Sequence, residues 1–156
     1  MTTYEMETLL GHLSVEHREL HARLQHLRQI IAACGGSPTL PPPERLAEFV
    51  RELELLEEEL RGHFAREEAG GYLEEAVTRR PVLNQESERL IHEHQALLAE
   101  MVALRKTVGS AMLNATIWPE AWARFHTLCR NLCEHESNEN KLIQRGYNVD
   151  FNGLLE

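Results

Sequence analysis

The chain has 156 residues, which suits one domain with a single sizeable core. Apolar residues make up 42% of the sequence and aromatic residues only 6%, as in a helical bundle rich in Leu and Ala. The net charge of −9 argues against nucleic acid, which would require a basic patch, and against an anionic membrane surface. Three cysteines without framework spacing favour a reducing compartment. We therefore expect a soluble cytoplasmic protein without a signal peptide or membrane span.

Four stretches of the chain carry apolar residues at alternating spacings of three and four, the period of a helix face turned toward a core. Gly35-Gly36 and Gly70-Gly71 are expected to stop the first two helices. Pro43 suits the first turn of the second helix, and Asn84 is a suitable N-cap for the third. The predicted helices cover about residues 4–33, 44–69, 84–108 and 119–145, with a short helical piece at 72–79.

Residues 109–117 are expected to form a polar loop, and Gly146 is expected to end the last helix. Four long helices joined by connections of modest length fit an antiparallel bundle. We therefore predict an all-α fold, a single domain over residues 1–156 that forms an up-down-up-down four-helix bundle.

We call the line of apolar residues along the core-facing side of each predicted helix its apolar seam. Each seam carries one histidine at a position where a leucine would be expected. On two helices a glutamate follows this histidine four residues later and lies on the same face. Burying such groups without partners is unfavourable by several kcal/mol for an ion, so a bound metal is the obvious compensation. The candidate metal ligands are His17, His63, Glu67, His94, His135 and Glu139.

The two halves of the sequence repeat this pattern. Glu16-His17 resembles Glu93-His94, and the His-x-x-x-Glu that begins at His63 resembles the one that begins at His135. Each half is thus a helical hairpin with one histidine on its first helix and a His-Glu pair on its second. Because both histidines of a hairpin are similarly far from the connecting turn, they lie at one depth in the bundle.

Four imidazoles and two carboxylates suit a pair of metal ions. Imidazole favours iron, zinc or copper, and another divalent metal fits the same residue types. If both glutamates bridge, each metal receives two nitrogens and two oxygens and keeps open positions for a small ligand. A lone core histidine is better explained by a hydrogen bond to a neighbouring carboxylate, but four in a repeated pattern favour the metal.

At these residues the sequence resembles the hemerythrin-like (HHE cation-binding) family, from Leu10 to about Asp150. The resemblance implies a four-helix bundle around a non-haem di-iron centre with an oxo or hydroxo bridge. It also implies roles for the six candidates. The terminal ligands would be His17, His63, His94 and His135, and the bridging ligands would be Glu67 and Glu139.

The sequence departs from the oxygen-carrying hemerythrins at two positions. Those proteins have a further histidine one turn before the third-helix ligand, where this chain has Leu90, and an Asp where Glu bridges here. The reduced set is more similar to hemerythrin-like proteins linked to iron, oxygen or nitric oxide sensing and to redox stress. Either solvent or His21, one turn after His17, is a candidate for the missing ligand.

We therefore expect a non-haem di-iron protein that binds or senses a small ligand such as oxygen or nitric oxide, or that handles iron. The expected partner is a diatomic molecule or peroxide, and the sequence indicates no particular protein partner. One alternative is a di-iron oxidoreductase acting on peroxide or nitric oxide, although the sequence marks neither an organic-substrate pocket nor a proton donor. A second alternative is a metal-free helical interaction module.

Overall fold

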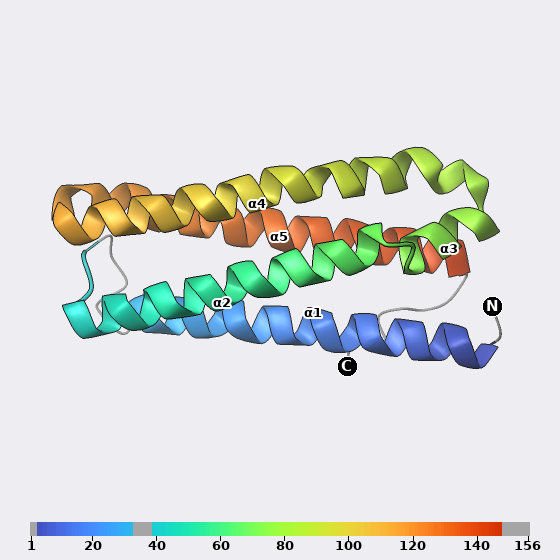
Figure 1. Ribbon diagram of the computed structural model, residues 1–156, viewed down its shortest axis with the longest axis horizontal. Helices are drawn as coiled ribbons and strands as arrows, with labels where there is room; N and C mark the ends of the chain where they lie inside the picture. Colours follow the sequence, from blue (N-terminus) through green and yellow to red (C-terminus); the bar gives the residue numbers. More distant parts are fainter. Residues whose placement is uncertain (1–2, 33–38, 148–156) are drawn as a thin grey trace.

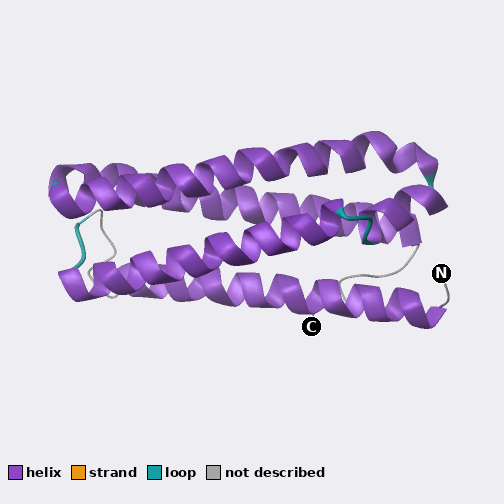
Figure 2. Ribbon diagram, in the orientation of Figure 1, coloured by secondary structure: helices purple, strands orange, loops and turns teal. Residues whose placement is uncertain are grey.

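The computed structural model describes residues 3–32 and 39–147, and four long helices dominate the fold (Figure 1). They are α1 (Thr3–Ala32), α2 (Pro43–Glu68), α4 (Asn84–Leu113) and α5 (Trp118–Tyr147). Three short elements connect them: α3 (Tyr72–Arg79) and the 3-10 turns η1 (Pro81–Leu83) and η2 (Ala115–Ile117). The described residues include no strand (Figure 2).

Successive long helices run in opposite directions, which confirms the predicted up-down-up-down bundle (Figure 1). α1 packs against α2, α4 packs against α5, and α2 also lies beside α4. The short helix α3 leaves the end of α2 and packs against α5 at one end of the bundle. Among the described residues, no helix combines the length and apolarity needed to cross a bilayer.

The ends of α2 have recognisable local causes. Pro43 occupies the first turn, where a missing N–H costs nothing, and Gly70 follows the helix with a φ of 89°. That left-handed conformation is accessible to glycine and strained for most other residues.

Asn84 does not cap α4, because Leu83 holds the N-cap position and no side chain caps the helix. The predicted stop at Gly35-Gly36 lies outside the described residues.

Two predicted helix ends are wrong. α4 does not stop before Gly109 but continues to Leu113, because Ala111 extends the buried seam and is fully buried. The expected loop at 109–117 therefore reduces to Asn114 followed by η2. α5 likewise continues past Gly146 to Tyr147. Gly146 permits close helix packing, since a Cβ atom there would lie 2.5 Å from Cβ of Ala76 in α3.

The buried apolar side chains form two clusters at different heights in the bundle. The larger cluster fills the end where α2 begins and α4 ends, and it includes Phe49, Leu56, Trp118 and Phe125. The smaller cluster fills the end with α3 and includes Leu13, Leu73, Leu83, Leu90 and Ile143. A layer of buried polar side chains lies between the two clusters.

We predict opposite stability effects for two Gly→Ala substitutions in helices. Gly146→Ala should lower the free energy of unfolding by about 1–3 kcal/mol, because the new methyl group would overlap Ala76. Gly109→Ala should raise it by about 0.5–1 kcal/mol, because no atom lies within 4 Å and alanine favours the helix. Urea unfolding of both variants measures the difference. Equal stabilisation of both would contradict the close approach of α3 and α5.

Candidate metal centre

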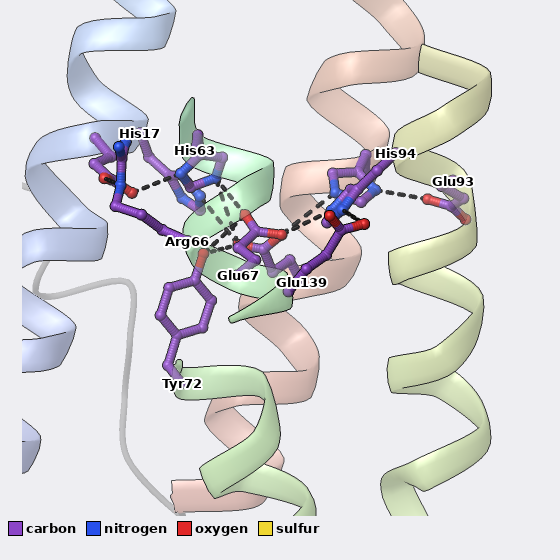
Figure 3. Close-up of polar contacts among 11 residues, drawn as sticks. His17, His63, Arg66, Glu67, Tyr72, Glu93, His94 and Glu139 are labelled. Carbon is purple, nitrogen blue, oxygen red and sulfur yellow. Dashed lines mark hydrogen bonds and ion pairs between the residues drawn. The ribbon is translucent and has the colours of Figure 1, made fainter. Parts of the chain in front are cut away.

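The polar layer brings together all six candidate ligands, which the four long helices carry at one height (Figure 3). Each comes from a seam position, and none is more than 6% exposed. His17 lies on α1 and His94 on α4, while α2 and α5 each supply a histidine and a glutamate: His63 and Glu67, His135 and Glu139.

The first histidine pair comes from the α1–α2 hairpin. His17 Nε2 lies 3.3 Å from Glu139 Oε1, and His63 Nε2 contacts Glu67 Oε1. His63 Nε2 also lies 4.0 Å from Glu139 Oε1. Both glutamates therefore direct their Oε1 atoms toward this pair, although Glu139 belongs to the other hairpin.

The second histidine pair comes from the α4–α5 hairpin and faces the other oxygen of each carboxylate. His94 Nε2 lies 2.7 Å from Glu67 Oε2, and His135 Nε2 lies 3.4 Å from Glu139 Oε2. The six residues thus form two groups of two histidines that share both glutamates, with the ligand atoms of each group within 4.8 Å of one another. This is the arrangement in which a carboxylate can bridge two cations.

Several ligand atoms at this centre are buried without a hydrogen-bond partner. They include the Nε2 atoms of all four histidines and the Oε2 atoms of both glutamates. A buried polar atom without a hydrogen bond costs about 1–3 kcal/mol, and here only ion-pair contacts between the imidazoles and the carboxylates offset that cost. Imidazole nitrogens and carboxylate oxygens are common metal donors. A cation in each group would satisfy these atoms together, and the donor set therefore fits metal binding.

Carboxylates behind the histidines orient two of the rings across each hairpin. Glu16, on α1, accepts a hydrogen bond from Nδ1 of His63 on α2 at 2.6 Å. Glu93, on α4, accepts one from Nδ1 of His135 on α5 at 2.7 Å. In the neutral imidazole this hydrogen bond keeps the proton on Nδ1 and leaves the lone pair of Nε2 for a cation. The two halves of the chain therefore repeat a supporting contact as well as the ligands.

Tyr72, the first residue of α3, reaches the centre from the end of the bundle (Figure 3). Its hydroxyl lies 2.8 Å from Oε1 of Glu67 and 2.8 Å from Oε1 of Glu139. Both oxygens face the His17–His63 pair, so the tyrosine distinguishes that half of the centre from the other. The seam pattern did not indicate that Tyr72, Glu16 and Glu93 belong to the site.

The remaining candidates lie elsewhere. His21 was a candidate for the missing ligand, but its side chain is 57% exposed and pairs with Glu136 at 2.8 Å. It belongs to neither of the two histidine–glutamate groups described above, which we call the metal-capable groups. Leu90, one turn before His94, is buried in the apolar cluster beside α3. His92, two residues before His94, is exposed and bonds the carbonyl of Glu88.

The sequence matches the description "Hemerythrin HHE cation binding domain" over residues 8–146, nearly the whole chain. This chain belongs to the hemerythrin HHE family. The match covers all six buried ligand candidates, and the cation binding for which the family is described agrees with the two histidine–glutamate groups. No curated protein and no solved structure gave a significant match.

The pKa values of two histidines in this hemerythrin-family centre are shifted well above the usual value for histidine. Burial alone would lower the pKa of His63, but the hydrogen bond to Glu16 and the charges of Glu67 and Glu139 outweigh it and raise the pKa to about 10. Burial likewise opposes protonation of His135, yet Glu139 and Glu93 raise its pKa to about 9. In the metal-free chain both imidazoles therefore hold protons at neutral pH, and a cation must displace them.

We predict that the metal-free chain loses stability as the pH rises. A histidine with a raised pKa stabilises the fold fully below its unfolded value near 6.5 and loses that contribution as the pH passes its folded value, here about 9 for His135 and 10 for His63. Urea midpoints measured with a chelator at pH 6.5, 8 and 10 should fall in that order. In metal-loaded protein the cation replaces the protons, so the decline should be weaker. A metal-free midpoint that rises over this range would contradict the proposed electrostatics.

Proposed function

We propose that the chain is a non-haem di-iron protein that binds or senses a small ligand such as oxygen or nitric oxide, or that handles iron. The observation that carries the proposal is the division of the carboxylate oxygens. Glu67 and Glu139 each direct Oε1 to one histidine pair and Oε2 to the other, as a carboxylate shared by two cations does.

The donor set supports iron in particular. Each position would receive two imidazole nitrogens and two carboxylate oxygens, a mixture that suits iron, and no cysteine belongs to either group among the described residues. In six-coordination this leaves about two positions per metal for a bridging atom and an exogenous ligand. A bound iron pair supplies redox-active sites with open coordination.

The protein's own contribution is to hold the donors and to exclude water. The apolar clusters above and below the polar layer shield it along the bundle axis, and all six side chains are nearly inaccessible. Glu16 and Glu93 fix the orientation of two imidazoles. Such an enclosed site fits a diatomic ligand better than an organic substrate.

Metal analysis of protein purified from iron-replete cells tests the proposal. We expect about two irons per chain, one for each histidine–glutamate group. His63→Ala should reduce the iron content and abolish most of the thermal stabilisation that iron gives, which is about 2.7 kcal/mol at 100 times the Kd. The matched control is His92→Ala, which removes an exposed histidine and should leave both quantities unchanged.

Less than one iron per chain, together with a His63→Ala variant as stable as the parent, would contradict the proposal. That result would favour a metal-free interaction module, in which replacing a buried histidine is neutral or stabilising.

One observation favours a second candidate, a di-iron oxidoreductase acting on peroxide or nitric oxide. The Tyr72 hydroxyl is a buried donor against both shared carboxylates. Burial and the charges of Glu139 and Glu67 raise its pKa, so the phenol keeps its proton at neutral pH. The raised pKa makes the phenol a weak acid, but its hydroxyl can stabilise a bound oxidant by donating a hydrogen bond at the centre.

Tyr72→Phe separates the two functions. It removes the hydroxyl and keeps the ring, so the iron content should stay close to that of the parent protein. In an oxidoreductase that uses this hydrogen bond, steady-state peroxide or nitric oxide turnover should fall by about 100-fold. Stoichiometric nitric oxide binding by the parent protein, with no turnover to lose, would instead support the binding and sensing role.

A further inference from the structure

The internal repeat places a lateral cavity beside each of the two metal-capable groups. One cavity lies between α4 and α5 and is lined by Glu93, Leu97 and His135. The other lies between α1 and α2 and is lined by the equivalent residues of the first hairpin, Glu16, Leu20 and His63. Because the residues correspond position by position, the two cavities can be compared directly.

The two cavities differ greatly in size. The α4–α5 cavity has a volume of about 230 Å³, whereas the α1–α2 cavity has about 50 Å³. Arg66 accounts for part of the difference, because it lines the small cavity and its Nε lies 2.5 Å from Oε1 of Glu16. The equivalent residue in the large cavity is the shorter and neutral Asn138.

The two cavities also differ in charge. In the first hairpin, Arg23 pairs with Glu59 at 2.6 Å and Arg66 pairs with Glu16, so two of the three glutamates that line the small cavity have arginine partners. At the position of Arg23 the second hairpin has Glu100, which accepts hydrogen bonds from the amide of Asn131 at 2.9 and 3.2 Å. The described lining of the large cavity contains three glutamates and no lysine or arginine.

The inner wall of the large cavity belongs to the metal centre. His135 lines the cavity and is 2% exposed, and its buried Nε2 has no hydrogen-bond partner. Glu93 lines the same cavity and holds Nδ1 of that ring at 2.7 Å (Figure 3 labels Glu93). The cavity therefore extends from the flank of the bundle to the side chain of one candidate ligand and to the carboxylate that supports it.

We propose that the α4–α5 cavity is the route by which a divalent cation reaches the centre, and that Arg66 closes the equivalent route between α1 and α2. This inference rests on the proposed metal-binding function. Carboxylates in a recess that have no cationic partner among the described residues, here Glu100 and Glu134, attract cations and raise their rate of arrival by about 10- to 1,000-fold. The small cavity is also lined by three glutamates, but Arg66 lines it and Arg23 pairs with Glu59, so it has less net negative charge as well as less space.

The test is the rate of ferrous iron uptake by the metal-free chain under anaerobic conditions, measured against a coloured ferrous chelator. Asn138→Arg gives the large cavity the residue that closes the small one, and should slow uptake at least about tenfold with little change in final iron content. The matched control, Gln29→Arg, adds the same charge at an exposed position of α1 and should load at the parental rate.

A second variant does not depend on a bulky side chain. Glu100→Gln with Glu134→Gln removes two carboxylates from the cavity but leaves Glu93 in place behind His135. It should also slow uptake several-fold and weaken the dependence of the rate on ionic strength. If Asn138→Arg fails to fold, this variant decides the question.

The outcomes separate the two proposals. A parent chain that takes up no iron overturns the metal-binding function. A parent chain that fills normally, with Asn138→Arg and the double variant filling at the control rate, overturns the route and leaves the function standing. If both variants take up iron at the control rate but bind nitric oxide more slowly than the parent chain, the cavity belongs to the small ligand, and the cation route is likewise overturned.

Discussion

The fold depends on how a layer of six polar side chains is accommodated inside an apolar bundle. Imidazoles and carboxylates at seam positions interrupt the leucine stripes, and removing them from water is unfavourable by several kcal/mol for each uncompensated ion. The structure offers partial compensation through the carboxylates behind the histidines and through Tyr72. The remaining imidazole nitrogens and carboxylate oxygens lie close together without hydrogen bonds, and a bound cation would give all of them a common partner.

The repeated hairpins explain how the site is assembled. Each hairpin contributes two histidines and one glutamate, and each metal-capable group takes one glutamate from the opposite hairpin. Neither hairpin therefore contains a complete group. The repeat is imperfect at Tyr72 and at the lateral positions of Arg66 and Asn138, so the two groups have different surroundings. The two hairpins therefore repeat the metal-capable residues but differ in the side chains that surround them.

Most of the fold and of the candidate site could be predicted from the spacing of apolar residues along each helix. This spacing identified the bundle, and the six residues that the structure brings together, because a position on a helix stripe determines whether a side chain faces the core. It could not show that Glu16 and Glu93 support histidines on the neighbouring helix, because helix spacing does not specify contacts between helices. Tyr72 was missed because its role depends on how α3 docks.

The helix ends were harder for a related reason. Glycines such as Gly109 and Gly146 usually indicate the end of a helix. Here burial of Ala111 extends α4 beyond Gly109, and the close approach of Ala76 explains the glycine near the end of α5. In both places a tertiary contact outweighs a local preference of about 1 kcal/mol. Local sequence alone does not contain that contact.

The position of Tyr72 has a consequence for exchange of the ion. Its hydroxyl contacts one carboxylate oxygen from each hairpin, so a single group ties the two halves of the bundle together at the level of the centre. In the proposed metal centre this link would keep the two glutamates aligned both before and after an ion binds. Binding or loss of the ion would then require movement of side chains and not of the helices that carry them.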